Sequence, residues 1–96
     1  MERNLVLEML RVHRADLNAL GVKSLAVFGS VARGAASPES DVDILVEFHQ
    51  SATFDGYMQT KFYLEDLLGC PVDLVVRQAI KPRMLPMVER EAIYVA

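Results

Sequence analysis

Several features that mark common classes of protein are missing from this sequence of 96 residues. It contains one cysteine, Cys70, which excludes an internal disulfide and is typical of a reducing cytosol. No apolar run approaches the roughly 20 residues of a membrane-spanning helix, and the opening MERNLVLEML has no signal-peptide pattern. We therefore expect a cytoplasmic protein with no membrane partner.

An excess of positive charge is missing too, since the formal net charge is −3 and the isoelectric point lies near 5.3. Proteins that bind the phosphate backbone of nucleic acids usually present a basic face. We therefore expect no direct nucleic-acid partner. Acidic side chains, if they cluster, could instead bind divalent cations.

Several ligand-binding motifs are absent as well. The two histidines, His13 and His49, lie far apart and the single cysteine forms no pair, which argues against a zinc site. No G-x-G-x-x-G is present, which argues against a dinucleotide site. GSVARG imitates the start of a Walker A loop, but alanines follow where that loop needs Lys and Ser or Thr, so a P-loop NTPase is excluded.

What the sequence does contain is an ordinary globular composition, 52% apolar and 24% charged, in a length that predicts one domain over residues 1–96. Apolar residues at helical spacing predict three helices, and short apolar runs predict three strands. The helices are expected at residues 5–20, at 54–68 and from about 82, and the strands at 24–28, 41–48 and 70–76. This alternation predicts an α/β (α+β) domain with a small mixed β-sheet and flanking helices.

The expected ends of these elements have local signals. Gly21 and Gly69 are placed to end the first two helices. Either Ser51 or Thr53 could cap the second helix. The composition of residues 35–40, AASPES, predicts a loop between the first two strands.

Two aspartates, Asp41 and Asp43, interrupt the second apolar strand. Because side chains alternate across a strand, both point to one face about 7 Å apart, while Val42 and Ile44 can fill the core behind them. Asp73 has a similar place in the next strand, so three carboxylates can converge on one spot. Their repulsion would favour the neutral forms unless cations bind. Two Mg²⁺ ions held by shared carboxylates are a recurring solution for phosphoryl or nucleotidyl transfer.

Simpler interpretations exist for these motifs. The D-x-D can be only a polar stretch of a surface strand, although an EF-hand is excluded because apolar residues stand where that loop needs ligands. The pair Gly29 and Ser30 can be only a turn. It can also let the backbone approach a phosphate, with Ser30 as a donor. Arg33 could then pair with phosphate oxygens.

Taken together, the motifs resemble those of the pol β-like nucleotidyltransferase superfamily, whose signature is Gly-Ser, then D-x-D, then a later third aspartate. The string GSVARGAASPESDVDILV and the short chain are most similar to the minimal nucleotidyltransferase (MNT) antitoxins, which are paired with HEPN-domain toxins. The motifs span residues 28–76, about half of the chain. The resemblance implies the nucleotidyltransferase fold.

The resemblance also implies a role for each motif residue. The residues expected to hold the triphosphate of an ATP donor are Gly29, Ser30 and, as a further contact, Arg33. Asp41 and Asp43 are expected to bind both metal and nucleotide phosphate. Asp73 is expected to complete the catalytic metal site and to help deprotonate the acceptor hydroxyl. The three aspartates would thus be catalytic residues and ligands of two Mg²⁺ ions.

The acceptor is expected to come from outside, because the sequence leaves no room for an acceptor-binding domain. The MNT resemblance implies that AMP passes from ATP to a tyrosine of a HEPN toxin, an RNase, which is neutralised within a hetero-oligomeric complex. Two alternatives stay open. The protein could be a non-enzymatic antitoxin that neutralises its toxin by binding alone, or a small nucleotidyltransferase that acts on another protein or a small molecule.

Overall fold

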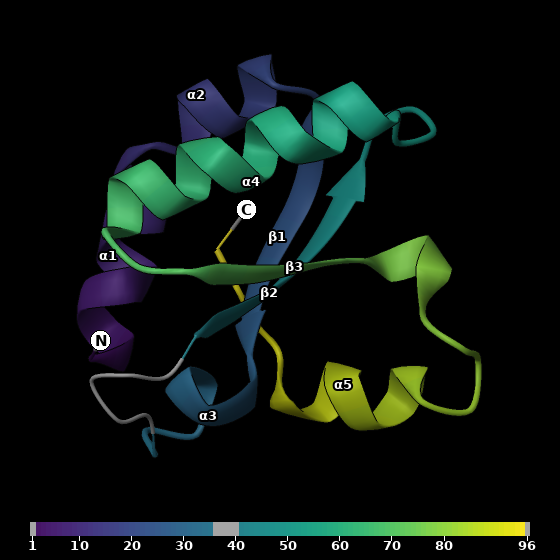
Figure 1. The fold of residues 1–96 in the computed structure, drawn as a ribbon. Helices are drawn as coiled ribbons and strands as arrows, with labels where there is room; N and C mark the ends of the chain where they lie inside the picture. The colour runs from purple at the N-terminus through teal and green to yellow at the C-terminus, as the bar shows by residue number, and fades with distance from the viewer. Residues whose placement is uncertain (1, 36–40, 96) are drawn as a thin grey trace.

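The structure, a computed structural model, describes residues 2–35 and 41–95, so residues 36–40 of the predicted loop lie outside the described residues. Helices and strands alternate along the chain, as Figure 1 shows. In chain order the elements are α1 (Arg3–Val12), α2 (Arg14–Ala19), β1 (Val22–Phe28), α3 (Gly29–Ala32), β2 (Val42–Phe48), α4 (Phe54–Leu68), β3 (Val72–Val76), the 3-10 turn η1 (Arg77–Ala79), α5 (Leu85–Glu91) and β4 (Ile93–Tyr94).

The strands form one mixed sheet in the order β3–β2–β1–β4. Strand β1 runs antiparallel to both β2 and β4, whereas β2 runs parallel to β3. Parallel neighbours need a crossover connection, and α4 supplies it between β2 and β3. The predicted α/β (α+β) domain with a small mixed sheet and flanking helices is therefore confirmed.

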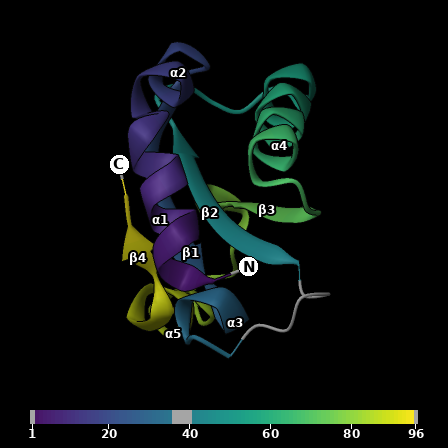
Figure 2. The ribbon, with the colours of Figure 1, turned by 90° about the vertical axis from the view of Figure 1, so that its left-hand side faces the viewer.

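The hydrophobic core lies between the sheet and the helices α1, α2 and α4. Figure 2 shows α1 and α4 side by side over the sheet. As the alternation in β2 predicted, Val42, Ile44 and Val46 are fully buried in this core. Helices α3 and α5 pack together at the end of β1. Within the described residues, no helix is both long enough and apolar enough to cross a bilayer.

The N-terminal helix is not continuous, so the prediction of one helix over residues 5–20 is wrong. His13 separates α1 from α2 and has a non-helical backbone conformation. Its ring Nδ1 lies 2.8 Å from the carbonyl oxygen of Met9, and the ring meets that of Tyr63 on α4 edge-on, at 6.5 Å between centroids. These contacts hold the half-buried ring at the rim of the core, where the break between the helices lies.

The C-terminal segment also differs from the prediction. The helix expected from Pro82 begins at Leu85, with Pro86 in its first turn, where the missing N–H group is tolerated. The sequence pattern predicts no strand in the apolar residues 92–96, yet Ile93 and Tyr94 form β4, the edge strand of the sheet beside β1. A strand of two residues has no alternation to detect, and only its pairing with β1 defines it.

Candidate active site

The turn after β1 depends on Gly29. Its φ of +71° lies in the left-handed region, which glycine adopts without strain. A Cβ atom on Gly29 would also overlap the Oδ2 atom of Asp43. The Asp43 carboxyl group therefore packs directly against the Gly29 backbone, and a residue with a side chain does not fit there.

Strand pairing places Asp43 between the two other parts of the site. In the antiparallel pair β1–β2 it lies opposite Phe28, the residue before Gly29, and in the parallel pair β2–β3 it lies opposite Asp73. Because Val42 is buried on the helix-covered face, alternation directs Asp43 to the opposite face. The turn after β1 and the two aspartates thus meet at one end of the sheet.

The electrostatic environment of Asp43 reflects this crowding of carboxyl groups. Burial raises the pKa of Asp43 most, followed by the negative charges of Asp73 and Asp41 and by a hydrogen bond with Asp73. The nearby Arg33 acts in the opposite direction and lowers the pKa of Asp43. A cation bound beside Asp43 would therefore relieve a repulsion that the fold itself creates.

The three predicted metal ligands are not equally close. Asp43 and Asp73 lie opposite each other on neighbouring strands, whereas Asp41 stands just before β2 and has no strand partner among the described residues; Asp43 is half-buried, and Asp41 and Asp73 are exposed. Among residues 2–35 and 41–95, no group of three or more His, Cys, Asp or Glu side chains is arranged to hold a metal ion. Mg²⁺ needs only one or two carboxylates when substrate phosphates complete its coordination. The donor set therefore fits Mg²⁺ that arrives with a nucleotide.

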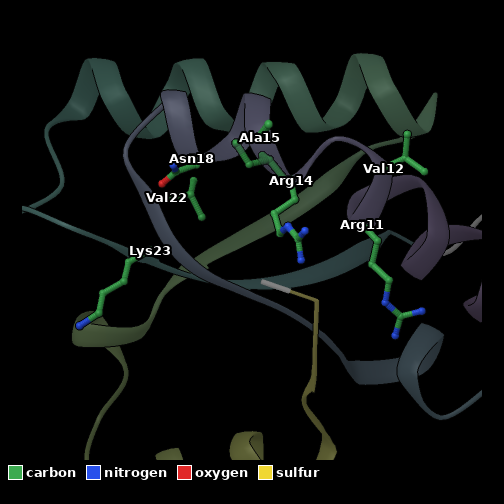
Figure 3. A pocket seen from close by; sticks show the side chains of 8 residues that line it. Arg11, Val12, Arg14, Ala15, Asn18, Val22 and Lys23 are labelled. Carbon is green, nitrogen blue, oxygen red and sulfur yellow. The ribbon is translucent and has the colours of Figure 1, made fainter.

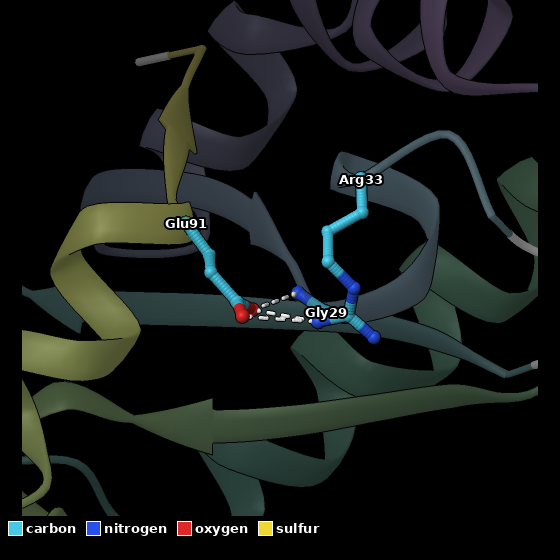
Figure 4. A network of polar contacts seen from close by, with 3 residues as sticks. All are labelled: Gly29, Arg33 and Glu91. Carbon is cyan, nitrogen blue, oxygen red and sulfur yellow. Dashed lines mark hydrogen bonds and ion pairs between the residues drawn. The ribbon is translucent and has the colours of Figure 1, made fainter.

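The residues predicted to bind phosphate lie on and beside α3. Ser30 is half-buried in its first turn, and Arg33 follows its last residue with an exposed side chain. Figure 4 shows that Arg33 reaches Glu91, the last residue of α5. The Arg33 Nη1 atom lies 3.0 Å from each carboxylate oxygen of Glu91, and the Gly29 N–H donates to Glu91 Oε2 over 3.3 Å.

Sequence reasoning did not find Glu91. Its two partners lie 58 and 62 residues away along the chain, so no local spacing links them. The sequence shows only a glutamate just before the apolar residues 92–96, which does not indicate a site. The contact becomes visible once β4 is paired with β1, because this pairing brings the end of α5 beside the turn after β1.

A separate hollow of about 440 Å³ lies at the other end of β1 and is shown in Figure 3. Its lining includes three basic side chains, those of Arg11, Arg14 and Lys23. Lys23 stands near the start of β1, whereas Gly29 follows its last residue. The hollow is therefore distinct from the cluster around Asp43, and none of the predicted site residues lines it.

Known proteins share sequence and fold with this chain. Residues 10–95 match the family described as Nucleotidyltransferase domain. Protein adenylyltransferase MntA of Thermococcus cleftensis is 41% identical over 88 residues, which cover 91% of this chain and 89% of that protein. A solved structure assigned to a minimal nucleotidyltransferase is 40% identical, with a TM-score of 0.79, and the match covers 97% of this chain and 95% of that chain.

A more distant structure shares the fold. It is a chain from the complex of an MNT antitoxin with a tri-AMPylated HEPN toxin of Shewanella oneidensis. The sequence identity is 16% and the TM-score is 0.68, over 94% of this chain and 71% of that chain. At this identity the likeness concerns the arrangement of strands and helices that holds the site.

Proposed function

The chain belongs to the nucleotidyltransferase domain family, and from that premise we propose that it transfers AMP from ATP to a tyrosine hydroxyl of a HEPN-domain RNase toxin. The transfer neutralises the toxin. The observation that carries the proposal is the meeting of Gly29, Asp43 and Asp73 at one end of the sheet. In this arrangement the backbone of Gly29, which has no side chain, lies beside two carboxylates. A triphosphate can approach the backbone there, and the carboxylates can bind its divalent cation.

The reaction is a displacement at the α-phosphorus of ATP. The tyrosine oxygen forms a new bond to this phosphorus, and the bond to the oxygen that bridges to the β-phosphorus breaks. Pyrophosphate leaves with that electron pair, and the tyrosine proton passes to Asp73. The turn at Gly29 and Ser30 holds the triphosphate, and Arg33 donates to its oxygens. Such a reaction depends mainly on positioning and on neutralising charge.

The aspartates hold the cation that this chemistry needs. Asp41, Asp43 and Asp73 are the proposed ligands of two Mg²⁺ ions, completed by phosphate oxygens of the nucleotide. When bound, these ions lower the pKa of the acceptor hydroxyl and neutralise charge on the leaving pyrophosphate. The raised pKa of Asp43 supports this role, because burial and the neighbouring charges of Asp73 and Asp41 all disfavour its ionised form.

Two findings support a protein acceptor. A relative of similar length, 41% identical to this chain, is named a protein adenylyltransferase. The fold is also shared with a complex in which a HEPN toxin carries AMP groups beside an MNT antitoxin. The proposal therefore places the toxin's tyrosine beside the exposed Asp73, in a hetero-oligomeric complex.

The direct test is to incubate the purified chain with a HEPN-domain toxin from the same organism, Mg²⁺ and ATP labelled at the α-phosphate. We expect label on the toxin, on a tyrosine, and loss of RNase activity in step with labelling. ATP labelled at the γ-phosphate is the control and should leave the toxin unlabelled. A stable complex that never acquires α-label would overturn the proposal.

The Asp43→Asn variant separates catalysis from binding. We expect AMP transfer to fall on the order of a hundredfold or more, because the cation loses a central ligand. Asp66→Asn, which changes an exposed carboxylate on α4, is the matched control and should transfer AMP normally. If Asp43→Asn still neutralises the toxin in cells, neutralisation by contact alone is the better explanation.

A further inference from the structure

Glu91 bridges two segments that the proposed reaction uses. Its Oε2 atom accepts from the Gly29 N–H over 3.3 Å, and both of its oxygens lie 3.0 Å from Arg33 Nη1. We propose that Glu91 is a positioning residue for nucleotide binding, which holds the Arg33 guanidinium and the Gly29 turn in the orientation that receives the triphosphate. The inference rests on the proposed function and deepens it.

The position of Glu91 is built into the sheet. Strand β4 pairs with β1 so that Ile93 lies opposite Val27. Antiparallel partners run in opposite directions, so the end of α5, just before β4, lies at the same end of the sheet as the turn that follows β1. The Gly29 N–H donates to the Glu91 side chain there. The pairing of β4 with β1 therefore brings Glu91 near the turn, and its carboxylate makes the contact.

The contact with Arg33 leaves most of the guanidinium available. Glu91 takes only the Nη1 group, and the Nε and Nη2 groups donate to no atom in the part of the chain that the structure describes. A guanidinium has five N–H donors, so it can serve a carboxylate and a phosphate at once. Figure 4 shows the guanidinium reaching Glu91 with one nitrogen while another points away from it.

Without Glu91, the same guanidinium would face competing carboxylates. Arg33 already interacts electrostatically with Asp43, which stands beside Asp73. A long arginine side chain has considerable rotamer freedom, so an untethered Arg33 would pair with the aspartates that the cation needs. Glu91 therefore does two things for the site: it limits the freedom of Arg33, and it keeps Arg33 from closing over Asp43.

A second, comparable ion pair on α5 makes it possible to tell whether Glu91 positions the nucleotide site or only stabilises the fold. Glu89 pairs with Arg77 at 2.9 Å, and the side chains are 33% and 37% exposed. In the pair of Glu91 with Arg33 the corresponding values are 33% and 53%. Exposed pairs of this kind contribute little to stability. Glu91→Ala and Glu89→Ala should therefore melt close to the wild type, and only Glu91→Ala should alter nucleotide binding.

The experiment measures binding of α,β-methylene-ATP, which cannot transfer AMP, to the full chain with Mg²⁺ by calorimetry. We expect Glu91→Ala to weaken binding about tenfold and Glu89→Ala to leave it unchanged, a coupling typical of contacting groups. In an Arg33→Ala background, Glu91→Ala should add less than about a twofold change, because Glu91 acts through Arg33. Glu91→Gln keeps the shape and one acceptor, and should fall between the wild type and Glu91→Ala.

Three results would overturn the inference and leave the proposed function standing. Equal affinities of wild type and Glu91→Ala would show that Glu91 positions nothing. Tighter binding by Glu91→Ala would show that the Glu91 carboxylate competes with the triphosphate. A full loss that persists in the Arg33→Ala background would show an action independent of Arg33. If the wild type itself fails to bind the analogue, the proposed function falls as well, which distinguishes the two failures.

Discussion

At the scale of single residues, the site is defined by where a side chain is absent. The carboxyl group of Asp43 occupies the space that a Cβ atom on residue 29 would fill. Gly34 offers a comparison, because it has the same φ of +71° but no described atom within 4 Å of the place that a Cβ atom would take. The two glycines therefore separate the cost of backbone strain from the cost of displacing Asp43.

Substituting both positions with alanine tests this difference. Gly34→Ala should destabilise the fold by about 1 kcal/mol, the cost of a left-handed residue with a Cβ atom. Gly29→Ala should cost roughly 2–4 kcal/mol, because overpacking against Asp43 is added. Urea denaturation measures both. Equal losses at the two positions would contradict the close packing of Asp43 on Gly29.

A second residue-scale prediction concerns how much the ionised Asp43 destabilises the folded state. Its pKa is raised, so the folded state holds the Asp43 proton more tightly than the unfolded state does. The destabilisation is absent below the unfolded pKa of about 3.9, grows as the pH rises toward the folded pKa, and is complete above it. In EDTA at neutral pH, Asp43→Asn should therefore be more stable than the wild type in urea denaturation.

The reference for Asp43→Asn is Asp66→Asn, which alters an exposed carboxylate on α4 and should leave the stability unchanged. The advantage of Asp43→Asn should shrink as the pH falls toward the unfolded pKa of about 3.9, because the wild-type carboxyl group becomes increasingly protonated. Added Mg²⁺ and nucleotide should stabilise the wild type and not Asp43→Asn. A metal-free wild type more stable than Asp43→Asn at neutral pH would contradict the raised pKa.

At the scale of elements, α4 shows what local signals can decide. The prediction over residues 54–68 matches the observed helix, which ends at Gly69 with φ of +69°. Of the two cap candidates, the structure selects Thr53, whose hydroxyl oxygen accepts from the Gly56 N–H over 3.0 Å. Capping signals act within one turn, so the sequence contains all the information that this boundary needs.

Removing the cap gives a prediction for this element. Thr53→Ala should destabilise the protein by about 1 kcal/mol, because the Gly56 N–H loses its acceptor. Ser51→Ala is the matched control, since Ser51 is an exposed loop residue before the helix, and it should have little effect. Thermal and urea unfolding compare the two variants. A larger loss for Ser51→Ala would mean that the helix is capped differently.

Other elements could not be predicted locally. The break at His13 leaves the apolar period intact, since Leu10 and Leu17 are both buried on either side of it. What marks the break is the contact of the His13 ring with Tyr63, which is 50 residues away along the chain. Strand β4 likewise exists only because β1 offers an edge to pair with.

At the scale of the whole molecule, the candidate site is assembled from segments that the sheet order brings together. Strand alternation predicted that the aspartates of β2 and β3 meet, and the family resemblance implied that Gly29 belongs with them; the structure places Asp43 beside both Asp73 and Gly29. Glu91 was not predictable, since its place depends on the pairing of β4 with β1, two strands that lie far apart along the chain. The sequence therefore predicted the groups proposed to carry the chemistry and missed a contact proposed to orient them.

This assembly predicts that nucleotide binding depends on the C-terminal strand. Val95 is 7% exposed in the core, and its N–H donates to the Leu25 carbonyl over 2.9 Å. Val22, which is 4% exposed at the start of β1, is the matched control at the far end of the strand from Gly29. Each Val→Ala change should destabilise the fold by about 2 kcal/mol, because buried methyl groups are lost.

The two variants should differ in nucleotide affinity. Loosening β4 with Val95→Ala frees the end of α5 and lets Glu91 leave Gly29, so binding of α,β-methylene-ATP with Mg²⁺ should weaken about threefold or more through local opening. Val22→Ala should bind as the wild type does, because β4 and Glu91 keep their places. Calorimetry well below the melting temperatures measures both. Equal affinities of the two variants would show that β4 does not hold the site together.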